Sequence, residues 1–338
     1  MPRITSLTIH AKDHAEFGYK IGKKLAREIH ARITTNKRVY KTERKKTFAD
    51  LIPVAQRFLP AVATYHPYLI GELEAMSEGA KVSFDDLLVM MCEEELLDFK
   101  MPHCTNIAIR TDMGALLGHS EDWLPMYLKN GLYVVKGMIG KQKILALSYM
   151  GSLAGTSCGM NEKFCYTANS LNSSRFRYGV PIKFQMRALL ENKTPQAAIR
   201  TDLKDSTIAS NMMYVWKDSR IFDVEDYFGH DHTFHAKQFL IHTNHPLLKK
   251  DRTHVNTAKE SLMRYARARD LLHAMAPTLR SLRIILRDHE AGICGHIDRL
   301  HPTYGITIAT AIMNPKEQWM DVAWANSCTN PYKRYRLE

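Results

Sequence analysis

The stretch that decides the fold runs Cys104-Thr105-Asn106-Ile107-Ala108-Ile109-Arg110-Thr111-Asp112-Met113-Gly114-Ala115-Leu116-Leu117-Gly118-His119-Ser120-Glu121-Asp122-Trp123. Two apolar-containing runs flank Asp112-Met113-Gly114, and a three-residue loop with glycine last is a common hairpin connection. If those residues form the loop, Thr111 faces Ala115 and Cys104 sits directly opposite Asp122. Opposed side chains on one sheet face have Cβ atoms about 4.5–5.5 Å apart. This register predicts a thiol beside a carboxylate, and a loop one residue longer sends Asp122 to the other face.

The composition is that of a globular protein. The chain has 338 residues, 45% hydrophobic and 24% charged, which suits one large domain or two ordinary ones. No apolar run approaches the roughly 20 residues that span a bilayer, and the start, Met1 to Thr5, lacks the apolar core of a signal peptide. Six cysteines without close spacing do not indicate a disulfide framework. We therefore expect a cytoplasmic protein without a membrane partner.

The net charge of +12 raises the question of an acidic partner. Basic residues are densest between Lys37 and Lys46, and such a run binds nucleic acid in some proteins. A solvated helix face is the more common role of an unsupported charge run. No zinc-finger spacing, glycine-rich phosphate loop or RNA motif accompanies this run. The sequence predicts no nucleic-acid partner, no cofactor and no metal.

Hydrophobic periodicity divides the chain into a helical first part and a mixed second part. Phe17, Ile21, Leu25 and Ile29 repeat every four residues, which predicts a helix from residue 13 to about 33, and residues 1–103 are expected to be mostly helical. Hairpins are predicted at 131–139 with 143–150 and at 212–216 with 220–224, helices at 183–190, 195–203, 257–275 and 279–286, and strands at 164–169, 239–246, 304–313 and 319–325. Strands in two groups with helices between them indicate an α+β layered domain.

Three motifs carry a resemblance to a known family. They are Cys104-Thr105, the run Gly118-His119-Ser120-Glu121-Asp122-Trp123, and Gly159-Met160-Asn161-Glu162-Lys163. Together they resemble the penicillin-type acyltransferase family of N-terminal nucleophile hydrolases, the group of isopenicillin-N acyltransferase, carcinine hydrolase and β-alanyl-dopamine hydrolase. The resemblance implies a four-layer αββα sandwich. It also implies self-cleavage at His103–Cys104, giving a small subunit 1–103 and a large subunit 104–338 that form one globular heterodimer.

The resemblance also assigns chemistry to individual residues. Cys104 is the implied nucleophile, and its freed α-amine, with an unperturbed pKa near 8, is the implied base. Asp122 positions that amine, while Asn244 and then Asn169 are the candidates for the oxyanion donor. The expected substrate is a small-molecule amide, with an amine or a coenzyme A thioester as co-substrate. Cleavage of a carbon–nitrogen bond by hydrolysis or acyl transfer is the expected reaction.

These residues also have simpler interpretations. Asp122 is a typical strand-end residue, Asn244 precedes His245-Pro246, where a turn is expected, and Asn169 is placed to cap a strand exit. The family usually has glycine where His103 stands, and its Asn-Trp-Asp-Trp type segment is Ser120-Glu121-Asp122-Trp123 here. The arginine that some members use near the acyl site has no clear counterpart, and Arg299 would be a guess.

Two other functions remain open. His230, His232 and His235, with His242 and His245 downstream, form a histidine-rich segment in which His-x-His on a strand is a metal-ligand pattern. A metal-dependent hydrolase is therefore one alternative, although a solvated loop is the more common role of such a segment. A non-catalytic binding protein on the same fold is the other alternative. A papain-like protease fits less well, because Cys104 opens a strand rather than a helix.

Overall fold

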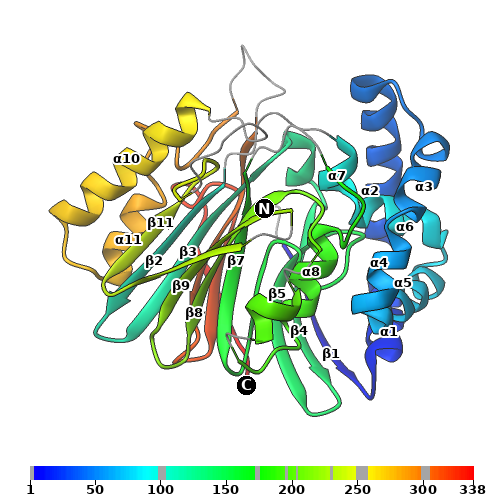
Figure 1. Ribbon diagram of the computed structural model, residues 1–338, viewed down its shortest axis with the longest axis horizontal. Helices are drawn as coiled ribbons and strands as arrows, with labels where there is room; N and C mark the ends of the chain where they lie inside the picture. Colours follow the sequence, from blue (N-terminus) through cyan, green and yellow to red (C-terminus); the bar gives the residue numbers. More distant parts are fainter. Residues whose placement is uncertain are drawn as a thin grey trace.

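Two β-sheets form the centre of the protein (Figure 1). The computed structural model describes residues 4–97, 104–171, 176–194, 197–202, 205–228, 231–248, 258–297 and 305–338. The larger sheet has the order β1-β4-β5-β6-β7-β8-β9-β10, and the smaller one has the order β11-β2-β3-β12-β13-β14. Among the described strands, β1 and β4 pair in parallel and the other neighbours are antiparallel.

The strands of the larger sheet are β1 (Thr5–Ala11), β4 (Leu132–Ile139), β5 (Gln142–Tyr149), β6 (Cys158–Asn161), β7 (Phe164–Ser170), β8 (Ala209–Trp216), β9 (Ile221–Tyr227) and β10 (Asp231–Ala236). Those of the smaller sheet are β2 (Thr105–Thr111), β3 (Gly114–Trp123), β11 (Phe239–His242), β12 (Ile306–Asn314), β13 (Trp319–Trp324) and β14 (Lys333–Arg336). The predicted hairpins at 131–150 and 212–224 are confirmed as β4–β5 and β8–β9.

Helices lie on the outer side of each sheet, as Figure 1 shows. On one side are α1 (His14–Lys24), α2 (Ala26–Val39), the π-helix η1 (Tyr40–Arg44), α3 (Phe48–Gln56), α4 (Leu59–Tyr65), α5 (Pro67–Ala80), α6 (Phe84–Met91), α7 (Glu93–Leu97) and α8 (Ile182–Leu189). On the other are α10 (Lys259–Ala274) and α11 (Leu279–Ile285). Two short elements, η2 (Pro125–Leu128) and η3 (Ala198–Asp202), are also present.

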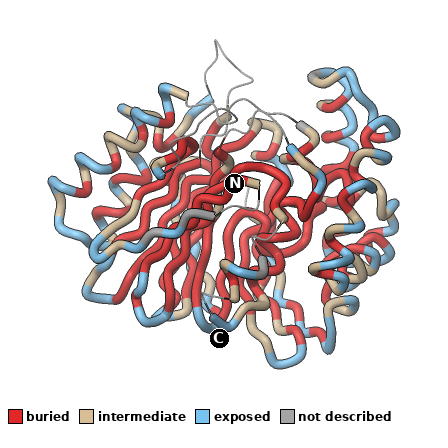
Figure 2. Tube along the Cα trace, viewed as in Figure 1, coloured by how far each residue is buried: buried red, intermediate tan, exposed pale blue. Residues whose placement is uncertain are grey.

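Three hydrophobic cores confirm four layers. On β4, Tyr133 and Val135 pack toward the helices on the larger sheet, while Val134 packs toward the smaller sheet. On β2, Ile107 belongs to a third core, which includes residues of α10 and α11. Alternate side chains of a strand point to opposite faces, so the central strands of both sheets are buried on both sides (Figure 2). The protein is an αββα sandwich.

A buried ion pair joins two helices, α8 and α5, of the layer that covers the larger sheet. Arg187 on α8 donates from Nη2 to Glu72 Oε2 at 2.7 Å and from Nε to Glu72 Oε1 at 2.9 Å, linking α8 to α5. Burial alone would raise the pKa of the Glu72 carboxyl, but the Arg187 guanidinium and His14 lower it below its usual range. Such two-point pairing fixes geometry as well as charge.

Two details of the first part of the chain differ from the sequence-based expectation. The predicted helix from 13 to 33 is two helices, α1 and α2, with Leu25 between them. Strand β1 was not predicted. It has only seven residues, and only its last inward positions, Ile9 and Ala11, are fully buried. No helix in the described ranges is long and apolar enough to cross a membrane. The cytoplasmic location stays a prediction.

The predicted register of the central hairpin is wrong by one residue. Thr111 pairs with Gly114, so the loop is the two residues Asp112 and Met113. Thr111 Oγ1 accepts from the Met113 N–H at 3.2 Å, and Gly114 closes the turn with φ +99°, a conformation that side chains disfavour. The ladder runs to Thr105 opposite Ser120. One step further along, Cys104 therefore faces Glu121 and not Asp122.

Candidate active site

Cys104 stands directly before β2 and faces the space between the two sheets. The residue is 7% exposed. The thiol donates to Glu121 Oε1, with Sγ 3.5 Å away, and lies 3.8 Å from the Asp122 carbonyl oxygen. Burial, followed by the charges of Glu121 and Asp122, raises the pKa of the Cys104 thiol well above its usual value. In the intact chain the sulfur is therefore a protonated thiol that needs a base to become a nucleophile.

Cys104 lines a pocket at the ends of several strands. Its wall also includes Glu94, Glu121, Trp123, Tyr149, Thr156, Ser157, Ala168, Asn169, Ser170, Ile182, Met186 and Ile208. Two carboxyl groups therefore share one mostly apolar and aromatic pocket with the thiol.

Glu121 is held as a carboxylate by two other side chains. Tyr149 donates to its Oε1 at 2.7 Å, and His119 Nε2 lies 3.2 Å from its Oε2. Burial alone would raise the pKa of Glu121, but the hydrogen bond and charge of His119 bring it below its usual value. Glu121 is thus the carboxylate that faces the nucleophile, a place that the sequence-based register gave to Asp122.

Asp122 lies on the other face of β3. Its Oδ1 accepts from Ser120 Oγ at 2.7 Å, and Ser120 also approaches Thr307 Oγ1 at 3.3 Å. Burial raises the pKa of Asp122 to about 6, although Thr307, the Arg264 charge and Ser120 oppose that change. Its backbone carbonyl, rather than its carboxylate, is the part that meets the Cys104 thiol. Its role toward the α-amine stays a prediction.

Arg264, on α10, is a site residue that the sequence analysis missed. Its Nη1 donates to the Cys104 carbonyl oxygen at 2.7 Å and to Thr105 Oγ1 at 2.9 Å, and its Nη2 donates to Asn244 Oδ1 at 2.7 Å. The guanidinium is buried, and its charge acts on both Cys104 and Asp122. One signal was available: Arg264 occupies the same buried stripe of the helix as Ala268 and Leu272, where a cation requires a partner. Arg299, the residue considered from the sequence, lies outside the described residues.

The two predicted asparagines lie near the site, but their amides already donate to backbone oxygens. Asn169 Nδ2 donates to the His242 and Thr243 carbonyls at 3.0 and 3.2 Å, and Asn169 lines the pocket. Asn244 Nδ2 donates to the Ser170 carbonyl at 2.9 Å. Both residues connect the strand end at Ser170 with the loop after β11. Which of them supplies an oxyanion donor stays a prediction.

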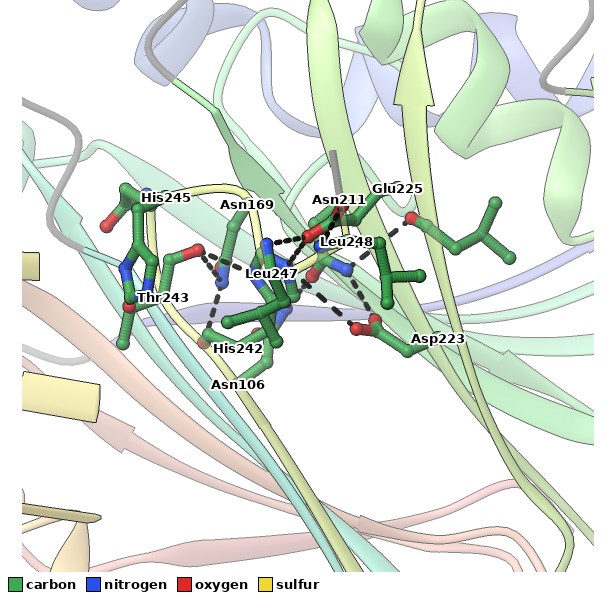
Figure 3. Close-up of polar contacts among 12 residues, drawn as sticks. Asn106, Asn169, Asn211, Asp223, Glu225, His242, Thr243, His245, Leu247 and Leu248 are labelled. Atoms are coloured by element: carbon green, nitrogen blue, oxygen red, sulfur yellow. Dashed lines mark hydrogen bonds and ion pairs between the residues drawn. The ribbon is translucent and has the colours of Figure 1, made fainter. Parts of the chain in front are cut away.

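A buried polar network supports this loop, as Figure 3 shows. His242 Nε2 lies 2.9 Å from Glu225 Oε1, and its Nδ1 lies 2.7 Å from the Thr243 carbonyl oxygen. Both ring nitrogens face acceptors, so the ring donates on both sides and is cationic. Burial alone would lower the pKa of His242, but Asp223 and Glu225 raise it. Burial raises the pKa of Asp223 to about 7, whereas Glu225, paired with His242, has a pKa of about 2 despite burial.

The histidine segment predicted as a metal site is only partly described. His230 lies outside the described residues, His232 is a backbone position of β10 opposite Glu225, and the exposed His235 ring packs on Phe222 at 4.4 Å between centroids. Ligand atoms close enough to hold a metal occur in two other groups of described residues. One is Cys104, His119 and Glu121, and the other is His289, Cys294, His296 and Cys328.

The acidic run Glu93-Glu94-Glu95 was also not recognised as part of the site. It is buried or half-buried rather than solvated, because Lys183 pairs with Glu93 at 2.9 Å and Thr207 donates to Glu95. Burial raises the pKa of Glu94, in the pocket wall, to about 8.

A family model described as acyl-coenzyme A:6-aminopenicillanic acid acyl-transferase matches residues 109–328, more than half of the chain. The chain belongs to this acyl-transferase family. Cys104 itself precedes the matched residues. The resemblance inferred from the three sequence motifs is confirmed at the level of the family.

The chain is also similar to individual known proteins. The β-alanyl-dopamine/carcinine hydrolase of Drosophila melanogaster is 28% identical over 174 residues, 45% of this chain and 44% of that protein, so the match spans less than half of the relative. Among solved structures, a mutant of conjugated bile acid hydrolase from Clostridium perfringens is 13% identical, with a TM-score of 0.50 over 69% of this chain and 92% of that one. Penicillin V acylase from Agrobacterium tumefaciens is 14% identical, with a TM-score of 0.48 over 69% and 86%.

The predicted fold is thereby confirmed. At these identities the structural likeness concerns the fold alone, and it agrees with the four layers seen in this family member. The protein has the N-terminal nucleophile hydrolase fold.

Proposed function

We propose that this acyl-transferase family member is a cysteine amidohydrolase or acyltransferase in which Cys104 carries the acyl group. The observation that carries this proposal is the position of the Cys104 thiol. It lies in the pocket wall at the start of a strand, beside a carboxylate that accepts its proton at 3.5 Å. The Cys104 carbonyl is held by Arg264, which fixes the backbone of the nucleophile. A thiol that served only for packing would not need these partners.

Self-cleavage would prepare the nucleophile. In the intact chain the Cys104 nitrogen is part of an amide and cannot act as a base. We propose that Glu121 takes the thiol proton while Sγ attacks the His103 carbonyl carbon. The carbon–nitrogen bond then breaks, the nitrogen takes a proton and becomes the α-amine, and water hydrolyses the remaining thioester. His103 lies outside the described residues, so the geometry of this step rests on Cys104 and Glu121 alone.

Turnover would then use the new amine. With an ordinary pKa near 8, it accepts the thiol proton as Sγ attacks the substrate amide, and this proton passes to the departing amine. Water, another amine or a coenzyme A thiol would take the acyl group. Asp122 would stabilise the protonated α-amine, and Asn169 or Asn244 would stabilise the oxyanion once its amide leaves its present carbonyl partner. The two fragments would remain a heterodimer, since both contribute to the same cores.

The pocket favours a substrate with a positive charge close to the scissile bond. Glu121 is a carboxylate in its wall, and Glu94, with a pKa of about 8, would gain its charge beside an ammonium group. No Lys, Arg or His is among its described lining residues. An ammonium group would be stabilised there because opposite charges interact strongly in a poorly solvated site. A β-alanyl amine, the substrate type in the name of the fly relative, carries such a group.

A matched pair of substrates tests this proposal. β-Alanyl-dopamine and propionyl-dopamine differ at the acyl end by one ammonium group. We expect kcat/KM to favour the β-alanyl amide by roughly tenfold or more, since one well-placed charged contact contributes about 1.5–3 kcal/mol. Glu94→Gln should reduce this preference and leave the propionyl amide unaffected. Equal rates for both amides would contradict the cationic-substrate assignment, and no turnover of any amide by matured protein would contradict the enzyme class.

Intact-mass spectrometry under denaturing conditions tests self-cleavage. The wild-type protein should give the fragments 1–103 and 104–338, while Cys104→Ala should give only the full-length chain. His103→Gly should mature at least as fast, because it removes a side chain beside the attacked carbonyl. A wild-type chain that stays whole while hydrolysing an amide would refute the α-amine mechanism, and His245 or His103 would then be the next candidates for the base.

A further inference from the structure

Four metal-ligand side chains converge at one end of the smaller sheet, outside the pocket. They are His289, after α11, Cys294 and His296, before β12, and Cys328, between β13 and β14. Their ligand atoms all lie within 4.8 Å of one another. Cys294 is buried, Cys328 is half-buried, and the two histidines are exposed, so the group is accessible from solvent on one side.

The distances among these atoms match the edges of a zinc tetrahedron. Zinc binds sulfur at about 2.3 Å and histidine nitrogen at about 2.0–2.1 Å. Tetrahedral angles then require separations of about 3.8 Å between two sulfurs, about 3.5 Å between sulfur and nitrogen, and about 3.3 Å between two nitrogens.

Four of the observed separations lie close to these values. Cys294 Sγ and Cys328 Sγ are 3.7 Å apart. His296 Nε2 lies 3.4 Å from Cys328 Sγ and 3.8 Å from Cys294 Sγ. His289 Nε2 lies 3.2 Å from His296 Nε2. Both imidazoles present Nε2 to this group, and both sulfurs are free thiols, so each of the four side chains can supply a ligand atom.

We propose that these four side chains form a Cys₂His₂ zinc site. Two thiolates and two neutral imidazoles fill all four positions, which is the composition of a structural site rather than a catalytic one. Asn326 supports one of the ligands, since it donates from Nδ2 to Cys294 Sγ at 3.3 Å and to the Gly295 carbonyl oxygen at 2.6 Å. An amide donor to a metal-bound thiolate orients the ligand and stabilises its charge.

The zinc site would join two loops of the smaller sheet, the one before β12 and the one between β13 and β14. The first of these loops contacts strand β3 of the β2–β3 hairpin. Ser120 Oγ lies 2.7 Å from Asp122 Oδ1 and 3.0 Å from the Ile293 carbonyl oxygen, so its single proton is shared between these two acceptors. Thr307 and Gly295 exchange two hydrogen bonds, of 3.0 and 2.8 Å. The segment with Cys294 is therefore attached directly to the face of β3 that carries Asp122. A metal that ties this segment to Cys328 would hold that face in place.

Sequence reasoning did not find this site because its ligands have no recognisable spacing. Cys294 and His296 are separated by one residue, but Cys328 lies beyond β12 and β13. The ligands therefore come together only in the folded protein. The proposal does not depend on the function proposed above, since it concerns binding of zinc alone.

Metal content tests the proposal directly. Protein without a histidine tag, produced in zinc-supplemented medium and purified under reducing conditions, should contain about one zinc per chain by inductively coupled plasma mass spectrometry. X-ray absorption at the zinc edge should give two sulfurs at about 2.3 Å and two nitrogens at about 2.0–2.1 Å. Cys328→Ala should lose most of the zinc, and His289→Ala should weaken zinc binding roughly tenfold or more with the loss of one nitrogen scatterer.

Matched controls distinguish this site from other sources of metal. Cys165→Ala, on β7, and His10→Ala, on β1, should retain the full zinc content. Cys104→Ala should retain it too, which separates the site from the group Cys104, His119 and Glu121. Circular dichroism confirms that each variant is folded, and the milder His289→Ala keeps the test valid if Cys328→Ala does not fold.

Three results would overturn the proposal. The first is wild-type protein that neither contains zinc nor takes up one equivalent when it is added under reducing conditions. The second is zinc that remains in Cys328→Ala or is lost equally from the controls. The third is a Cys294–Cys328 disulfide in freshly purified protein, which mass spectrometry after alkylation of free thiols would reveal.

Discussion

Replacing Glu121 with glutamine should lower the pKa of the Cys104 thiol and slow self-cleavage. The carboxylate oxygen lies 3.5 Å from Sγ, so a thiolate there repels it at short range. Glutamine at this position would keep the size of the side chain and remove the charge. The same substitution removes the group that we propose to take the thiol proton in the intact chain.

The size of the effect follows from the distance. Two unit charges about 3.5 Å apart interact by about 5 kcal/mol at an effective dielectric constant of about 20, which corresponds to about 3.5 pKa units. His119 and Tyr149 share the charge of Glu121, so we expect a smaller decrease, of about 1–2 units. Loss of a positioned proton acceptor should slow self-cleavage by about 10²–10⁴-fold.

The assay is the pH dependence of alkylation at Cys104. Iodoacetamide labelling of the Cys104 peptide, followed by mass spectrometry, separates this thiol from the other five cysteines. Asp122→Asn is the matched comparison: its charge also raises the Cys104 pKa, but by less than that of Glu121, so its removal should shift the profile less. If Asp122→Asn shifts the alkylation profile and Glu121→Gln does not, the hairpin register and the role given to Glu121 are both refuted.

Three further predictions concern the surroundings of the nucleophile. Asp122→Asn should keep the melting temperature within a few degrees, since Ser120 can still hydrogen-bond the amide oxygen, and should lose most turnover; normal turnover would refute its role. Arg264→Met should lower the free energy of unfolding, measured in urea, by about 3–5 kcal/mol because it leaves buried acceptors without their charged donor. Arg264→Lys should lower it less. Small and equal effects of the two substitutions would show that the guanidinium contacts contribute little. Glu225 has a folded-state pKa of about 2 against an ordinary 4.5, so its stabilisation, about 3 kcal/mol, is present above pH 4.5 and is lost as the pH falls toward 2. The difference in unfolding free energy between wild type and Glu225→Gln should shrink over that range, and a constant difference would contradict the pKa assignment.

Sequence periodicity was sufficient for the amphipathic parts of the fold. The helices that have one solvent face, such as α10 and α11, and the hairpins β4–β5 and β8–β9 were found close to their observed bounds. The four layers did not follow from the pattern, because a strand such as β12 is buried along its whole length, threonines included, and its sequence does not tell which layer covers each face. They were expected only from the family resemblance.

The site was less accessible to sequence reasoning than the fold. Cys104 was identified by its motif, but its carboxylate partner was displaced by one residue because a three-residue loop was assumed where Thr111 stabilises a two-residue one. In a strand, an error of one residue exchanges the two faces. Arg264 comes from a helix distant in sequence, and Glu94 from an acidic run that the sequence analysis did not connect with the site. The position of Arg264 on the apolar stripe of α10 suggests burial, but its contact with Cys104 is visible only in three dimensions.

A series of hydrogen bonds connects Glu121, beside the Cys104 thiol, to the larger sheet. Asn211, on β8, must donate its Nδ2 to the Asp223 carboxylate, so its Oδ1 accepts from Asn106 Nδ2 at 3.3 Å. Asn106 Oδ1 then faces His119 Nδ1 at 2.7 Å, and His119 must donate there. With Nδ1 donating to Asn106, Nε2 donates to Glu121 only when both ring nitrogens carry protons. In this position the His119 ring is held against the carboxylate that meets the thiol.

This bridge crosses the core between two sheets, where apolar packing would be at least as stabilising. What the polar residues add is a fixed direction for each donor. The asparagines on β2 and β8 therefore act on the chemistry at Cys104 by fixing the orientation of the His119 ring, although neither of them lines the pocket.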